Sequence, residues 1–393
     1  MEPVVKNRIL SIDILRGVVM VIMALDHVRD FFHVSAMTAD PLDPATTYPA
    51  LFFTRWITHF CAPVFVFLSG VSARLAGSRR RPAELSRFLI SRGLWLVLVE
   101  VVIVTLGITF NPFYHVIILQ VIWAIGTSMV LLGLLVRLGA FWTLLAGVIL
   151  FVGHQVTDYL AAPPGTAGMI YQVLLTARAS VIPLSDTRFI FALYAVLPWA
   201  GVMFLGYAAG AWFLPGMPAA TRFRNLMVTG CLAIILFTLL RLLNGYGDPA
   251  PWSVQRTPGF TFLSFLNTTK YPPSLMFLLM TLGPALVTLA LLEWSGGRAA
   301  RILSVYGKVP FFYYVIHFYL IHTLTVIAFF ASGYPASQIA DPNIPFFFRP
   351  VTFGFSLGVV YLVWLLVVVA LYRPCLWFSR YKAGHKQWWL SYL

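Results

Sequence analysis

Residues 10–32 read LSIDILRGVVMVIMALDHVRDFF, and this stretch decides the class of protein. It is mostly apolar and is longer than the roughly 20 residues that a helix needs to cross the hydrocarbon core of a bilayer. It ends in Asp26-His27-Val28-Arg29 rather than in the small residues that precede a signal-peptide cleavage site. We therefore expect it to remain as a membrane-spanning helix.

The rest of the chain repeats this apolar character. Of its 393 residues, 60% are hydrophobic and 10% are charged, whereas a soluble domain carries roughly a quarter charged residues. Apolar stretches predict ten spans, near residues 10–32, 56–76, 93–110, 116–137, 141–160, 188–213, 224–244, 272–294, 309–331 and 351–372. The expected fold is an all-α polytopic transmembrane helix bundle, formed by residues 1–393 as a single membrane domain without an internal repeat.

The distribution of basic residues predicts the orientation. The net charge is +14, but the basic residues recur in short clusters between apolar stretches and form no single patch, so we expect no nucleic-acid partner. With the N-terminus inside, every inner segment except the short loop at Arg137 carries at least two basic residues, which is the positive-inside pattern. We expect both termini in the cytoplasm, a multi-pass protein of the cell's inner (plasma) membrane, and a working face on the side of the long outer connections.

Ionisable residues inside a span are costly and mark a functional site or a buried pair. Asp13 and Arg16 are three residues apart and can pair on one helix face. Arg16 and His27 are eleven residues apart, almost three turns, so they share a face and stand roughly 16 Å apart along the axis. The first span therefore presents a cation near the inner side and a titratable base near the outer side. The alternative is a structural ion pair and an interfacial histidine.

Other histidines are expected at a similar depth. His59 begins the second predicted span and His317 lies within the ninth. Histidine is the side chain best suited to move a proton near neutral pH. We predict His27 as the catalytic base, ahead of His59 and His317, with Asp26 or Asp30 orienting its imidazole. No His-x-x-x-His spacing occurs, and no metal is expected.

Further polar residues lie near the outer span ends. The segment Asn267–Ser274 is polar, and Lys270 or Asn267 can bind an acceptor or polarise a carbonyl, although an ordinary helix-initiating turn with proline is equally consistent. Arg188 and Arg241 can anchor an anionic group or simply extend their charged ends to the interface.

Several segments resemble known membrane acyltransferases. Leu15-Arg16-Gly17 followed by His27 resembles the signature of the acyltransferase-3 type. Residues 11–17, 63–70 and 313–317 more closely resemble the family of heparan-α-glucosaminide N-acetyltransferase, with its bacterial branch and nearby YeiB-type membrane proteins. The most motif-like parts are residues 8–76, with 264–322.

The resemblance implies transfer of an acetyl group from cytoplasmic acetyl-CoA to an amine or hydroxyl of a sugar or glycan on the other side of the membrane. In acyltransferase-3 proteins the histidine that matches His27 is catalytic. In the lysosomal enzyme the catalytic histidine lies between the first two conserved spans, a region near which this chain has His33 and His59. The implied donor site contains Arg16, Asp13 and Lys308. The histidine would act as a general base or carry the acyl group.

Two other functions are consistent with the same residues. A transporter or permease for a small sugar or anion also needs charges inside its spans, but the lack of a repeat is unusual for that class. A non-catalytic membrane scaffold or partner-binding protein would leave the clustered His, Arg and Asp residues without a purpose. Each of these functions is compatible with an oligomer. If acyl-CoA protects His27 or His59 from chemical modification, the protein is an enzyme rather than a transporter or a scaffold.

Overall fold

The computed structural model describes residues 9–178, 180–341 and 344–391, and these are largely helical. Helix α1 (Leu10–Phe32) is a 23-residue helix, as predicted. Within the described residues, nine other helical stretches are long and apolar enough to cross a membrane, whereas α1, predicted as the first span, carries too many charged residues to be counted among them. They are α2 (Pro49–Thr58) with α3 (Cys61–Gly77), α4 (Pro82–Val99) through α5 (Thr105–Thr109), α6 (Val121–Leu135), α7 (Ala140–Gly153), α9 (Val196–Ala209), α10 (Ala219–Leu243), α12 (Leu275–Leu291), α14 (Pro310–Ala331) and α15 (Leu357–Gly384). The predicted polytopic helical bundle is confirmed.

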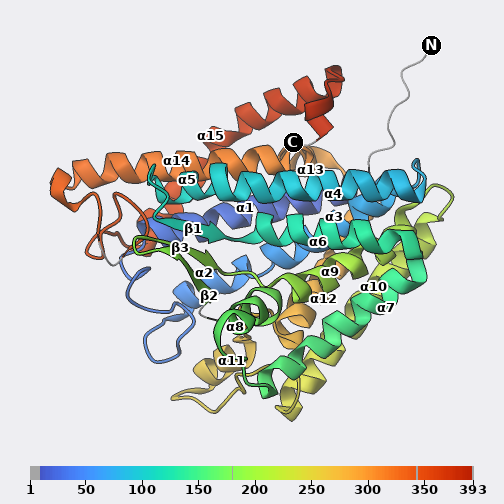
Figure 1. Cartoon of the computed structure of the whole chain (residues 1–393), viewed down its shortest axis with the longest axis horizontal. Helices are drawn as coiled ribbons and strands as arrows, with labels where there is room; N and C mark the ends of the chain where they lie inside the picture. Colours follow the sequence, from blue (N-terminus) through green and yellow to red (C-terminus); the bar gives the residue numbers. More distant parts are fainter. Residues whose placement is uncertain (1–8, 179, 342–343, 392–393) are drawn as a thin grey trace.

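Helix α1 lies at the centre of the bundle. It packs against α3, α14, α15 and the short helix α13 (Gly297–Lys308), while α4 packs against α6. Helices α1, α4, α6 and α14 run along the longest axis of the molecule (Figure 1). Most residues of α1 are buried, so its polar side chains face other helices and the pockets between them rather than lipid.

Close approach between helices depends on glycine. A Cβ atom at Gly17 of α1 would collide with the carbonyl oxygen of Leu303, and one at Gly307 of α13 would collide with that of Asp13. Small residues at such crossings allow backbones to approach closely. In lipid, helix pairs gain little from the hydrophobic effect, so dispersion attraction between the closely packed atoms stabilises the pair. The α1–α13 crossing holds the inner half of α1 in place.

Replacing Gly307 with alanine should therefore destabilise the protein by about 1–3 kcal/mol, because the added methyl group forces two backbones apart. The matched control is Gly153→Ala in α7, where an added Cβ has no atom within 4 Å. Thermal unfolding in detergent, followed by tryptophan fluorescence, measures the difference. Equal midpoints for the two variants would contradict the assigned crossing.

Two predicted spans begin with strands rather than helix, which corrects the sequence-based boundaries. Residues 116–119 form β1 (Val116–Leu119), and residues 188–192 form β3 (Arg188–Ala192). With β2 (Ser180–Ser185) they make a small sheet of order β1-β3-β2, in which β3 is parallel to β1 and antiparallel to β2. Short apolar runs of Val, Ile and Phe do not distinguish a buried strand from a helix. Non-helical backbone is tolerated at membrane depth where protein surrounds it.

Other boundaries also shift, among them those of the third and tenth spans. The third span, predicted at 93–110, begins at Pro82, where the proline occupies the first turn and the Arg81 amide donates to Glu84 at 3.2 Å. The tenth begins at Leu357 rather than 351 and continues to Gly384. Polar residues at the ends predicted to lie inside extend both helices beyond their apolar segments, which are all that hydropathy detects.

The outer ends of the helices are covered by the sheet, by α2 and by the connection that precedes α15 (Figure 1). In that connection, Arg349 is fully buried and donates to the carbonyl oxygens of His33, Pro350 and Phe353 at 2.5–2.9 Å. Burial lowers the pKa of Arg349 to about 10, so the guanidinium stays charged at neutral pH. It fixes the loop against the end of α1. The short helices α8 (Gly165–Tyr171) and α11 (Pro258–Leu266) lie in the other outer connections.

Candidate active site

Two pockets lie one above the other along α1, α3, α6 and α14. The outer pocket has a volume of about 420 Å³ and is lined by residues of these helices together with Arg55 of α2, Tyr194 after β3, and Lys270. The inner pocket has a volume of about 310 Å³ and is lined by residues of the same four helices together with α4, α13 and α15. Phe65 and Val121 line both pockets.

His27 lies in the outer pocket. Its side chain is 16% exposed, and its Nδ1 atom is 4.0 Å from an oxygen of Asp30, one turn further along α1. The ring packs against Phe318, with 4.4 Å between centroids, and against His317, with 5.2 Å. The Asp30 side chain is 39% exposed, so the pocket reaches the outer surface of the protein. His27 is thus a partly shielded base beside a carboxylate.

Asp26 is engaged elsewhere. Its carboxylate accepts hydrogen bonds from Arg55 at 2.7 and 2.5 Å and from Arg29 at 3.0 Å. Arg29 also donates to Asp30 at 2.6 Å. Of the two carboxylates predicted to orient His27, the structure therefore places Asp30 beside the imidazole and uses Asp26 to hold α2 against α1.

The structure brings His317, but not His59, to His27. The His317 Nδ1 atom lies 2.5 Å from the carbonyl oxygen of Tyr314. Because a carbonyl only accepts, this nitrogen carries a proton, and in the neutral form of the ring Nε2 is then an acceptor. Nε2 is buried without a hydrogen-bond partner among the described residues. His59 is fully buried, packs against Phe277 and lines neither pocket.

Among the residues predicted to bind the acceptor, only Lys270 lines the outer pocket, next to Tyr271. Arg241 is 2% exposed and donates to the carbonyl oxygens of Ala250, Ser264, Phe265 and Asn267. The Asn267 side chain donates to the Leu42 carbonyl at 3.2 Å. Arg188, the first residue of β3, is exposed and lines neither pocket. Arg241 and Asn267 thus fix the outer connections in place.

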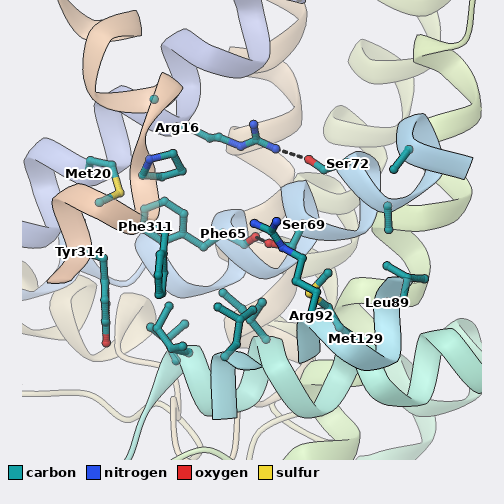
Figure 2. Close-up of a pocket in the computed structure, with 18 of the residues that line it drawn as sticks. Arg16, Met20, Phe65, Ser69, Ser72, Leu89, Arg92, Met129, Phe311 and Tyr314 are labelled. Atoms are coloured by element: carbon teal, nitrogen blue, oxygen red, sulfur yellow. Dashed lines mark hydrogen bonds between the residues drawn. The ribbon is translucent and has the colours of Figure 1, made fainter. Parts of the chain in front are cut away.

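The inner pocket is lined by both basic and apolar side chains. Its basic residues are Arg16 of α1, Arg92 of α4, Lys308 of α13 and Lys382 of α15. None of the described residues that line this pocket is acidic. Arg16 donates to the Leu68 carbonyl at 3.1 Å and to the Ser72 hydroxyl. Figure 2 shows Arg16 directed toward Ser72, with the rings of Phe311 and Tyr314 on the other side of the pocket. Asp13 lies 3.9 Å from Arg16 but outside the lining.

Several of these residues were not predicted as site residues. Arg55, Arg92 and Lys382 enter the sequence-based prediction only as members of the charge pattern that indicates topology. Each reaches its pocket because helices far apart in the chain pack together, so no local spacing indicates it. Among the described residues, no group of three or more His, Cys, Asp or Glu side chains is placed to hold a metal ion.

The family model described as heparan-alpha-glucosaminide N-acetyltransferase, catalytic, matches residues 8–240, more than half of the chain. The chain belongs to this family. The matched region includes Arg16 and His27 and the segments of α1, α3 and α6 that line both pockets, whereas Lys270, Lys308 and His317 lie beyond it. Membership identifies the protein as a membrane acetyltransferase and confirms the resemblance found in the sequence. A search of curated proteins finds no match to the chain.

Proposed function

We propose that this protein transfers an acetyl group from cytoplasmic acetyl-CoA to an amine or hydroxyl of a sugar or glycan bound in the outer pocket, in the cell's inner (plasma) membrane. One observation carries the proposal. A basic pocket and a histidine pocket lie in line on the same four helices and share part of their walls. Such an arrangement suits a donor and an acceptor that approach from opposite sides.

The inner pocket fits a CoA donor. Its four basic side chains suit phosphate groups, since hydrogen bonds from cationic donors to phosphate are among the strongest in proteins. Its apolar side chains, which include Met20 and Phe311, suit the uncharged pantetheine arm. Arg16 and His27 are roughly 16 Å apart along α1, which is of the order of an extended pantetheine arm. A thioester carried on that arm would reach the level of His27.

The outer pocket fits the acceptor and the chemistry. As the acceptor oxygen or nitrogen attacks the thioester carbonyl carbon, His27 takes its proton, the C–S bond breaks, and the CoA thiolate leaves and is protonated. Asp30 stabilises the imidazolium that forms. Lys270 would bind the acceptor or polarise the carbonyl. In the alternative route His27 itself attacks and holds the acetyl group until the acceptor removes it.

Reconstituted protein given radiolabelled acetyl-CoA and a panel of amino sugars and neutral sugars tests this proposal. We expect label on a sugar, with release of one free CoA thiol for each acetyl group transferred. Protein that neither binds acetyl-CoA nor transfers label to any acceptor would overturn it and favour the transporter alternative.

Arg92 provides a test of the donor site. Arg92→Gln should raise the KM for acetyl-CoA by about tenfold or more, because loss of a charge-assisted hydrogen bond costs about 1.5–3 kcal/mol. The control is Arg87→Gln on the same helix, since Arg87 is exposed and lines neither pocket. Initial rates at varied acetyl-CoA measure both variants. An unchanged KM in Arg92→Gln would place the phosphates elsewhere.

A further inference from the structure

The boundary between the two pockets is thin. Phe65 of α3 and Val121 of α6 line both of them. On α1, Met20 lines the inner pocket and Met23, one turn later, lines the outer one. The pockets are therefore separated by about one layer of side chains.

The spacing along α3 places Phe65 within that layer. Ala62 lines the outer pocket, Ser69 and Ser72 line the inner pocket, and Phe65 lies between them on the same face, at intervals of three and four residues. Its neighbours on this face are small, so its ring is the bulkiest group that α3 presents to the pockets. Phe65 is one of the labelled residues around the inner pocket in Figure 2.

This layer separates two pockets that both contain charged side chains. The outer pocket reaches the surface at Asp30, which is 39% exposed, and the inner pocket contains four cationic side chains. Without a partition, the two would form one continuous passage along the bundle, with charged side chains in both of its halves. An apolar constriction blocks such a path because water leaves a narrow passage whose walls offer it no hydrogen bonds.

We propose that Phe65, with Val121, is a hydrophobic partition that keeps water and small solutes from passing between the pockets and yields only to the thioester arm of the donor. This inference rests on the proposed function for the identity of the donor. The barrier itself follows from the two pockets and their shared wall. It makes Phe65 a specificity-determining residue, because the ring decides what reaches His27 from the inner side.

Two consequences follow for Phe65→Ala. Water should reach the thioester in the absence of an acceptor, where it attacks the carbonyl carbon, breaks the C–S bond and releases acetate and the free thiol of CoA. Small solutes should also cross the bundle. Phe65→Leu, which keeps apolar bulk, should retain most of the barrier.

The experiment uses the full chain in proteoliposomes and two readouts. The first is thiol release from acetyl-CoA without acceptor, expected to rise at least about tenfold in Phe65→Ala and less in Phe65→Leu. The second is leakage of protons and of a small trapped dye, which requires no transferase activity. The matched control is Phe312→Ala, a partly buried phenylalanine of α14 that lines neither pocket. Val121→Ala is a second, smaller deletion in the same wall, for use if Phe65→Ala does not fold.

The outcomes separate the two proposals. Increased leakage in Phe65→Ala and Val121→Ala but not in Phe312→Ala supports the partition, even if wild-type protein transfers no acetyl group. Leakage and thiol release that stay at the wild-type level in folded Phe65→Ala protein, or that rise equally in the control, would overturn the partition and leave the transferase proposal standing.

Discussion

Replacing His27 with glutamine is expected to lower the rate of acetyl transfer by about 10²- to 10⁴-fold, the usual contribution of a positioned general base. Glutamine fills similar space and keeps hydrogen-bonding groups near Asp30 but cannot accept the proton of the acceptor. Because the inner pocket, the proposed donor site, is separate from His27, the dissociation constant for acetyl-CoA should be nearly unchanged. Initial rates and equilibrium binding on the same preparation measure both quantities.

Two comparisons sharpen this test. Asp30→Asn should lower the rate by less than His27→Gln, since the carboxylate is 4.0 Å from the imidazole and assists it without touching the acceptor proton. His59→Gln should leave the chemistry intact, because His59 is buried outside both pockets. If His27→Gln transfers acetyl groups at a rate within a few-fold of wild type and His317→Gln loses transfer, His317 rather than His27 is the general base.

The same variants distinguish direct transfer from an acyl-enzyme. With labelled acetyl-CoA and no acceptor, the covalent route predicts label on the wild-type protein that is absent from His27→Gln. The direct route predicts no labelled protein in either case. Acid quenching followed by peptide mapping makes the comparison.

The relative placement of Arg16 and His27 could be predicted from the sequence of α1 alone. Helical periodicity places Arg16 and His27 on one face about three turns apart, and the structure places them in the inner and outer pockets, respectively. The relative position of the two residues follows from their spacing because α1 is a single unbroken helix, in which separation along the sequence fixes separation in space.

The prediction for His59 rests on its expected depth in the membrane, and depth alone does not fix the direction of a side chain. Helix α2 ends at Thr58 and α3 begins at Cys61, so His59 lies in the break between them. Periodicity does not carry across a break, and the side chain turns toward Phe277 instead of the pocket. His317, in the unbroken helix α14, does meet His27.

Buried cations show a second limit of sequence. A cation near a span end suggests ligand binding, yet Arg241 and Arg349 both donate to backbone carbonyls of outer connections. Carbonyls carry no sequence signature, because every residue has one. Whether such an arginine binds a ligand or holds a loop is therefore decided only by the tertiary fold.

The largest expected effect on stability comes from Asp26. Its side chain is 11% exposed and accepts from Arg29 and Arg55, whose side chains are 5% and 14% exposed. Asp26→Asn removes the negative charge that the two guanidinium groups share, although Arg29 keeps its hydrogen bond to Asp30. Breaking a buried ion pair in this way costs about 3–5 kcal/mol. Thermal unfolding in detergent should show it, with Asp186→Asn, in the exposed turn after β2, as a neutral control.

Removing Arg55 as well should restore part of that loss. In Asp26→Asn with Arg55→Met, the charge left without a partner is gone and the methionine side chain fills part of its space, so the double variant should be more stable than Asp26→Asn alone. The double-mutant cycle gives the coupling energy directly. Strictly additive effects would mean that the two side chains do not stabilise each other. A positive coupling would identify this pair as the link that holds α2 over the outer pocket and sets the position of Arg55 in its wall.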